Sequence, residues 1–203
     1  MINSKQLVTT LALALCLAQP LAMAEETRDK VAVCAGCHGP EGHSRVPDNP
    51  ILAAQHADYL VSALRAYVSG ERDYGIMKTL AGRLSDGDMQ DIAVYYAAQS
   101  PTRSEATARG DAARGEARAA MCVACHGPGG HSVIPANPRL AGQHARYLSG
   151  ALSAYKSGAR SNPVMASMVA ALSEQDIEDI AAYFAAQAPQ AAGAGATAGG
   201  QPQ

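Results

Sequence analysis

The chain has 203 residues, of which 48% are hydrophobic and 17% charged, a composition typical of a folded soluble protein and not of a multi-span membrane protein. A formal charge of −2 without a basic stripe excludes a nucleic-acid binder, because nothing would neutralise the phosphates. Only 4% of the residues are aromatic, so a domain of about 80–100 residues would have a thin core that something besides side chains completes.

The N-terminal segment has the features of a secretory signal. Lys5 precedes an apolar run from Leu7 to Ala18, and the small-residue triplet Ala22-Met23-Ala24 follows that run. This pattern predicts a cleaved signal peptide over residues 1–24 and an exported mature protein. A retained membrane anchor is the alternative, but the run is shorter than the ~20 residues that span a bilayer. Cys16 is expected to leave with the signal, so four cysteines remain.

The rest of the chain contains a tandem repeat. At a shift of 88 residues, Cys34-Ala-Gly-Cys-His38 aligns with Cys122-Val-Ala-Cys-His126, and the alignment continues without a gap to Gln99 and Gln187. Two copies are too few for a solenoid, so the repeat predicts two similar domains. The expected segments are a first domain over 25–103, a second domain over 104–188 and a disordered Ala- and Gly-rich tail over 189–203.

The hydrophobic periodicity inside each repeat is helical, and strand signals are absent. The helices expected in the first repeat span about 25–33, 56–69 and 85–99, and in the second repeat the first helix spans 104–121. Ser85 with Asp88, and Ser173 with Asp176, are the N-cap pairs of the last helices. We expect loops between the helices, among them 71–83. The fold class is therefore all-α, with about three main helices and long loops around one bound group per domain.

Each repeat carries a Cys-x-x-Cys-His motif. The motif is typical of c-type haem attachment, in which both thiols form thioethers with haem vinyl groups and the adjacent imidazole reaches the iron. The residues expected to hold two haem c groups in this way are Cys34, Cys37, Cys122 and Cys125, with His38 and His126 as iron ligands. The spacing argues against two disulfides, and neither a thioredoxin-type redox pair nor a zinc site explains the His in both copies.

Met77 and Met165 are the candidates for the second axial ligand. Each lies 39 residues after the motif His, in an expected loop before the last helix, and the pair is present in both repeats. A thioether ligand keeps the iron six-coordinate and raises its potential. Met168 lies one helical turn beyond Met165, but its counterpart is Leu80, which cannot ligate. Core packing is the expectation for the other methionines of the repeats, Met89, Met121 and Met168.

The remaining histidines of the repeats are alternatives for the axial position. His43 and His131 follow the motif so closely that they are not expected to reach the opposite face of the haem. His56 and His144 each open a helix, and we expect them to be surface residues or hydrogen-bond partners. Met therefore stays the preferred second ligand.

These residues resemble class I cytochromes c, and the doubled arrangement is similar to the dihaem cytochrome c4 family. Besides the two haem-binding motifs, the resemblance rests on Pro-x-Leu at 50–52 and 138–140 and on Gly-x-Arg at 70–72 and 158–160. It implies that the carbonyls of Pro50 and Pro138 accept the Nδ1–H of the motif histidines. It also implies that Arg72 and Arg160 pair with haem propionates.

Two departures from the family pattern stand out. The family has a Gly where the first and last helices cross; Gly115 provides it in the second repeat, but Thr27 stands at the matching position of the first. We expect a looser crossing there. Tyr74 and Lys78 have no equivalents in the second repeat, so the two haem potentials are expected to differ.

A haem with both axial positions filled has no vacancy for a substrate, so electron transfer and not catalysis is the predicted function. The leading interpretation is a periplasmic dihaem carrier between a quinol-oxidising complex and a terminal oxidase or similar acceptor. The alternatives are a cytochrome subunit of a flavin-containing, sulfide-oxidising dehydrogenase and a dihaem peroxidase. Residues 25–108 carry a charge of −4 and residues 109–203 carry +1, a dipole that would orient redox partners. Peripheral association with the membrane and the oligomeric state stay open.

Overall fold

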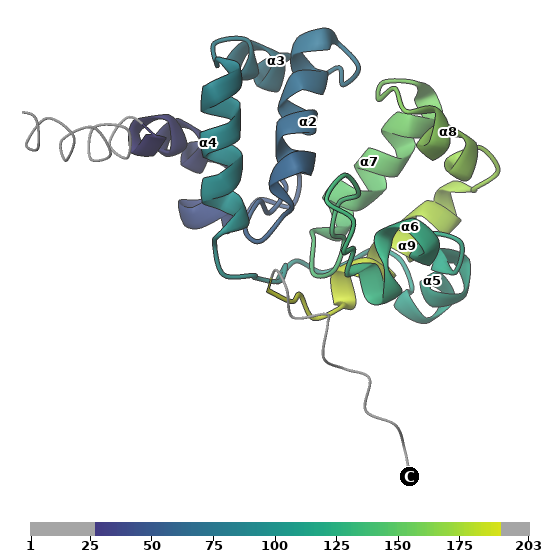
Figure 1. Cartoon of the computed structure of the whole chain (residues 1–203). Coiled ribbons are helices and arrows are strands. Elements are labelled where there is room, and N and C mark those ends of the chain that lie inside the picture. Colours follow the sequence, from purple (N-terminus) through teal and green to yellow (C-terminus); the bar gives the residue numbers. More distant parts are fainter. Residues whose placement is uncertain (1–26, 192–203) are drawn as a thin grey trace, which may run out of the picture.

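The computed structural model describes residues 27–191, which form two similar helical bundles in succession (Figure 1). Within this range the β-structure is limited to an isolated bridge between Arg72 and Arg160, so the all-α expectation is confirmed. The signal peptide, Cys16 and the end of the tail lie outside the described residues. In the described part of the chain, no helix has both the length and the apolar character needed to cross a membrane.

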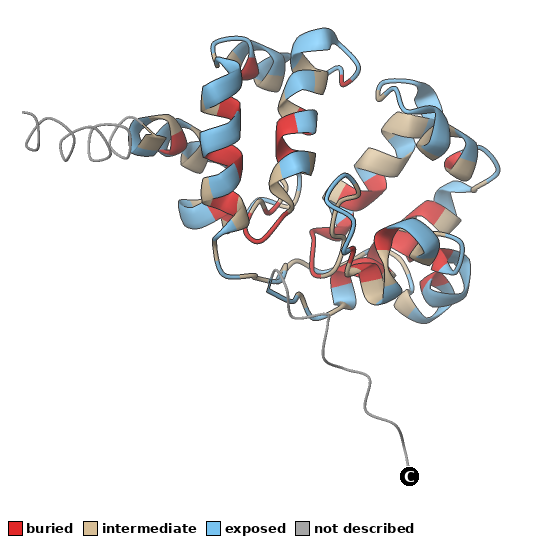
Figure 2. Cartoon of the chain, viewed as in Figure 1, coloured by how far each residue is buried: buried red, intermediate tan, exposed pale blue. Residues whose placement is uncertain are grey.

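The first bundle consists of a helix over residues 27–38, η1 (Pro40–Gly42), α2 (Ala57–Ser69), α3 (Gly75–Ala81) and α4 (Asp86–Ala97). Its core lies where α2, α4 and the first helix meet. The buried residues of this core are Val31, Leu60, Val61, Ile92, Ala93 and Tyr96. Figure 2 shows buried positions along both α2 and α4, between long exposed stretches.

The second bundle repeats this arrangement with α5 (Ala112–Ala119), α6 (Val123–His126), η2 (Pro128–Gly130), α7 (Ala145–Ser157), α8 (Pro163–Val169) and α9 (Glu174–Ala186). The buried residues of its core are Ala119, Ala145, Leu148, Ile180, Ala181, Phe184 and Ala185. The two core clusters contain only six and seven buried residues, and four of the seven in the second bundle are alanines. Neither bundle therefore has a large hydrophobic core of its own.

The predicted helix starts at Ser85 and Ser173 are confirmed. Each Ser accepts a hydrogen bond from the backbone N–H three residues on, and the side chains of Asp88 and Asp176 accept from the N–H of Ser85 and Ser173. Two orphan N–H groups are satisfied at each start. The last helix of each bundle is thereby fixed at its N-terminus.

The prediction of a helix over 104–121 is wrong. Helix α5 begins only after Asp111, whose side chain accepts from the N–H groups of Ala113 and Arg114. Ser104 instead bonds to the second bundle, because its N–H donates to the carbonyl of Gly142 over 2.7 Å. The first helix of the first bundle is longer than predicted, because it continues to residue 38 and does not end at residue 33.

Helices α5 and α9 cross at Gly115. A Cβ atom at this position would lie 1.9 Å from the carbonyl oxygen of Asp179, closer than any van der Waals contact allows. Only Gly permits this approach. Thr27 stands at the matching position of the first repeat, and a looser crossing there stays a prediction.

Candidate functional site

In the first bundle, the Cys-x-x-Cys-His motif forms the end of the helix over 27–38. Cys34 is half-buried and Cys37 exposed, and both are free thiols. His38 is 8% exposed, and its Nδ1–H donates to the carbonyl of Pro50 over 2.9 Å. Burial lowers the pKa of His38, which favours the neutral imidazole. A neutral ring whose Nδ1 is occupied presents Nε2 as the atom that can bind a metal.

The second bundle builds the same arrangement. Cys122 is half-buried, Cys125 is exposed, and both are free. His126 is buried, its Nδ1–H donates to the carbonyl of Pro138 over 2.9 Å, and burial lowers its pKa. The hydrogen bonds to Pro50 and Pro138 that the resemblance implies are therefore present in both repeats.

Two asparagines, to which sequence reasoning assigned no role, connect the loop before each Pro to the Cys-x-x-Cys-His motif. The Asn49 side chain donates to the carbonyl of Cys37, and the Asn137 side chain donates to that of Cys125, both over 2.9 Å. Each Asn precedes the Pro that receives the His bond. The recurrence of Asn-Pro in both repeats was the available signal. These bonds tie the proline loop to the motif from two sides.

The two candidate methionine ligands lie in short helices and not in loops. Met77 is the third residue of α3, and Met165 is the third residue of α8. Both side chains are partly buried, and so is that of Met168. Asn162 caps α8 by accepting from the N–H of Met165 over 3.0 Å. A helical scaffold thus sets the direction of each candidate thioether.

Of the methionines expected in the core, Met89 is buried, but the prediction for Met121 is wrong. Met121 is 54% exposed, because α5 ends at Ala119 and Met121 lies in the turn before α6. Its counterpart, Val33, is likewise exposed.

The alternative histidine ligands have other partners. The Nε2–H of His56 donates to the carbonyl of Ser132 over 2.8 Å, and the Nε2–H of His144 donates to that of Ser44 over 3.0 Å. Both bonds cross from one bundle to the other. His144 is only 2% exposed, and its Nδ1 lies 2.6 Å from the Ser104 hydroxyl, so both ring nitrogens are used. Of the two roles expected for this pair, the hydrogen-bonding one is confirmed.

His43 and His131 lie on the loops that follow the two motifs. The Nε2–H of His43 donates to the carbonyl of Ser100 over 3.0 Å. Burial lowers the pKa of His131, and the positive charge of Arg139 lowers it further. His131 contributes with Arg139 to the wall of a small hollow at the junction of the bundles.

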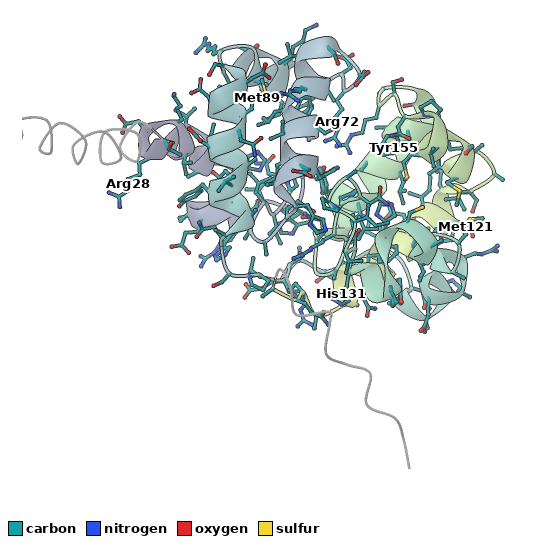
Figure 3. All side chains as sticks on the ribbon, viewed as in Figure 1. Arg28, Arg72, Met89, Met121, His131 and Tyr155 are labelled. Atoms are coloured by element: carbon teal, nitrogen blue, oxygen red, sulfur yellow. The ribbon has the colours of Figure 1, made fainter. Side chains whose placement is uncertain are left out.

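Arg72 is buried at the junction between the bundles. It is 8% exposed and donates to the Tyr59 hydroxyl over 3.0 Å. Its guanidinium also lies 5.3 Å from the Tyr59 ring centre and 5.7 Å from that of Tyr67. Figure 3 shows Arg72 on the side of the first bundle that faces Tyr155 of the second.

Arg160 occupies the equivalent place in the second bundle. It donates to the Tyr147 hydroxyl over 3.2 Å and lies 5.3 Å from that ring centre and 5.8 Å from that of Tyr155. Arg72 and Arg160 face each other in the isolated antiparallel bridge. Within residues 27–191, no carboxylate forms an ion pair with either guanidinium. The buried Arg72 and the half-buried Arg160, without a counter-charge, call for an anionic group at this junction.

The donor groups present fit a covalently bound haem in each bundle. Each bundle supplies two free thiols, a neutral imidazole nitrogen, a thioether on a short helix and a guanidinium for carboxylates. Among residues 27–191, no group of three or more His, Cys, Asp or Glu side chains is arranged to hold a metal ion by itself.

Comparisons with known proteins identify the family. The family model described as cytochrome c matches residues 112–187. A cytochrome c4 of Pseudomonas aeruginosa is 36% identical over 168 residues, which cover 76% of this chain and 84% of the relative. The chain belongs to the cytochrome c4 family. The crystal structure of reduced recombinant cytochrome c4 from Pseudomonas stutzeri superposes with a TM-score of 0.71 at 31% identity, covering 81% of this chain and 98% of that chain.

The membership confirms the tandem cytochrome c fold and two covalently bound haem c groups. This member of the cytochrome c4 family is therefore an electron-transfer cytochrome. The chain is also similar to a protein of Stutzerimonas stutzeri named as a thiosulfate dehydrogenase electron acceptor. The identity is 36% over 167 residues, which cover 75% of this chain and 77% of the relative.

Proposed function

We propose that this protein carries single electrons in the periplasm, from a quinol-oxidising complex to a terminal oxidase or a similar acceptor. The observation that carries the proposal is the duplicated site, in which a buried His with its Nδ1 occupied is matched by a Met on a short helix in both repeats. His and Met side chains would hold the iron of each haem, and the bound haem would supply reversible one-electron transfer.

The residues proposed to hold the first haem are Cys34 and Cys37 through thioether bonds, with His38 and Met77 as iron ligands. In the second bundle, Cys122 and Cys125 take the attachment role, and His126 and Met165 are the ligands. Pro50 and Pro138 fix the orientation of each imidazole and increase its basicity through the Nδ1–H hydrogen bonds. Little rearrangement then accompanies a change of oxidation state.

Arg72 and Arg160 are proposed to bind haem propionates. Both guanidiniums are held by tyrosines at the junction of the bundles, and neither has a carboxylate partner among residues 27–191. A propionate would supply the missing negative charge.

Partner kinetics test the carrier role. Purified haem-loaded protein is mixed in a stopped-flow instrument first with a quinol-oxidising complex and then with a terminal oxidase, at several salt concentrations. We expect both haems to be reduced and reoxidised, with rates that fall as salt increases, because residues 25–108 carry a charge of −4 and residues 109–203 carry +1. Failure to exchange electrons with either complex would contradict the proposal.

Export and domain organisation are proposed from the sequence. The segment over residues 1–24 is proposed as a cleaved signal, and N-terminal sequencing of protein from the periplasmic fraction should begin at Glu25. The second domain is proposed to start at residue 104. The hydrogen bonds from Ser104 to Gly142 and His144 support this boundary. A first residue other than Glu25, or recovery only in the cytoplasm, would contradict the export proposal.

A second candidate function is electron acceptor of a sulfur-oxidising dehydrogenase. The similarity to the Stutzerimonas stutzeri protein named as a thiosulfate dehydrogenase electron acceptor favours it. Rapid haem reduction by thiosulfate dehydrogenase with thiosulfate, and slow reduction by the quinol-oxidising complex, would select this candidate. Co-purification with a flavoprotein would instead favour a flavin-containing partner. The peroxidase alternative requires an exchangeable axial position, and equivalent methionines in both repeats argue against it.

A further inference from the structure

Tyr96 carries a buried hydroxyl that the packing does not explain. The residue is 1% exposed and lies in the core of the first bundle. Its hydroxyl is the one buried side-chain nitrogen or oxygen of the described residues that has no hydrogen-bond partner. Burying an unpaired hydroxyl is unfavourable, and such groups in a native structure often have a redox or ligand-binding role.

The neighbour of this hydroxyl is a haem-attachment thiol. Cys34 packs against the core cluster that contains Tyr96, which brings its sulfur near the Tyr96 ring, and its thiol donates to the carbonyl of Lys30 over 3.5 Å. Burial raises the pKa of the Cys34 thiol above its ordinary value. The sulfur is therefore uncharged and is held in the same apolar environment as the hydroxyl.

The second bundle provides a natural comparison, because Phe184 occupies the equivalent position. Phe184 is 2% exposed, and its carbonyl accepts from the N–H of Gly142 over 2.9 Å, as the Tyr96 carbonyl accepts from Ala54 over 3.0 Å. Each ring also has an edge-on aromatic neighbour, with centroids 5.2 Å apart for Tyr96 and 5.0 Å apart for Phe184. The two sites therefore differ at this position by one hydroxyl group, and the fold does not need it.

We propose that the Tyr96 hydroxyl donates a hydrogen bond to the sulfur through which Cys34 holds the first haem, and that this bond raises the reduction potential of that haem. The inference rests on the proposed attachment of a haem at Cys34. A thioether sulfur is a weak hydrogen-bond acceptor, but a buried hydroxyl without another acceptor gains by donating to it. With a haem attached at Cys34, the positive end of the O–H dipole would disfavour the ferric state of that haem, which carries one more positive charge. Tyr96 is thus a tuning residue that distinguishes the two haems.

The test uses full-length haem-loaded protein with Tyr96→Phe, the reciprocal Phe184→Tyr, and Tyr95→Phe as a control that removes the hydroxyl of the half-buried neighbouring ring. The ratio of oxidised to reduced haem is measured at fixed ambient potential, with each haem identified by its NMR signals. We expect Tyr96→Phe to increase the ratio for the first haem about two- to fivefold, the size expected from one modest hydrogen bond. The second haem and the Tyr95→Phe protein should be unchanged.

Phe184→Tyr should shift the ratio of the second haem in the opposite direction. Resonance Raman bands of the thioether linkage give a second readout, and they should change in Tyr96→Phe but not in Tyr95→Phe. An unchanged ratio and unchanged Raman bands in Tyr96→Phe would overturn the inference. If the Tyr96→Phe variant keeps two methionine-ligated haems, the proposed carrier function stands even when the tuning role of Tyr96 is refuted. Loss of a haem, or of its methionine ligand, would instead count against the proposed haem site.

Discussion

The side chain of Gln143 in the second bundle holds both backbone polar groups of Ile51 in the first. Its Oε1 accepts from the Ile51 N–H and its Nε2 donates to the Ile51 carbonyl, each over 2.9 Å. Gln55 makes the same pair of bonds to Arg139, over 2.9 and 3.0 Å. Because the two glutamines are equivalent in the repeat, the junction has approximate twofold symmetry.

Replacing Gln143 with Ala should loosen the junction between the bundles. The N–H and carbonyl of Ile51 would lose their partners in a buried place, which costs about 1–3 kcal/mol. Denaturant unfolding of the haem-loaded protein measures the loss. Gln90→Ala, at an exposed position of α4, is the matched control and should leave the free energy of unfolding unchanged. Equal stability of the two variants would mean that Gln143 does not support the junction.

Gly115→Ala should destabilise the second bundle strongly. The new Cβ would meet the carbonyl of Asp179 at 1.9 Å, so α5 and α9 would have to separate, at a cost of about 3 kcal/mol or more. Gly150→Ala is the control, because nothing lies within 4 Å of a Cβ at that position of α7. It should stabilise the protein by up to about 1 kcal/mol through helix propensity. Thermal denaturation of both variants measures these changes in stability. If Gly115→Ala were as stable as the wild type, the close crossing of α5 and α9 would be refuted.

Acid should weaken the folded protein through His144. Burial lowers the pKa of His144 below its ordinary value of 6.5, and the hydrogen bond from the ring to the Ser44 carbonyl offsets only part of this shift. The unfolded chain therefore binds the proton more readily, and the stability present above pH 6.5 declines as the pH falls through that value. Burial also lowers the pKa of His56, which acts in the same direction.

The free energy of unfolding measured between pH 7.5 and 5 tests this prediction. Wild-type protein should lose stability over this interval more steeply than His144→Gln, which does not titrate. Parallel curves for the two proteins would show that His144 contributes nothing to the acid sensitivity.

Met165→Leu and Met168→Leu should separate the two candidate ligands of the second bundle. Both side chains are partly buried on α8, so packing alone does not distinguish them. Loss of a thioether ligand removes the far-red absorption band of a methionine-ligated ferric haem and opens the iron to carbon monoxide. We expect Met165→Leu to lose about half of the band, and Met168→Leu to keep all of it. The reverse result would assign the ligand to Met168.

The features that sequence reasoning predicted are those with local or repeated signals. The Cys-x-x-Cys-His motifs, the methionine pair and the caps at Ser85 and Ser173 each need only a short stretch of chain, and the duplication supplied every one of them twice. Local reasoning failed at Ser104, which is a good N-cap residue. Its backbone and hydroxyl bond to a distant segment instead, and Asp111 caps the helix.

The contacts between the bundles could not be predicted from the sequence either, because they too join residues that are far apart in the chain. Gln55 and Arg139 are 84 residues apart, and no periodicity reports such a pairing. The recurrence of Gln-His in both repeats showed that these residues matter, but not what they contact. The short helices α3 and α8 were missed because seven residues flanked by Gly, Pro or Asn carry too little helical pattern.

The most direct test counts the covalently attached haems of the purified chain and determines the ligands of each iron. The account predicts two haems per chain that resist acid extraction, and both irons should show the far-red methionine band and no reaction with carbon monoxide. A single haem, haem that can be extracted, or an iron that binds carbon monoxide in the native protein would contradict it.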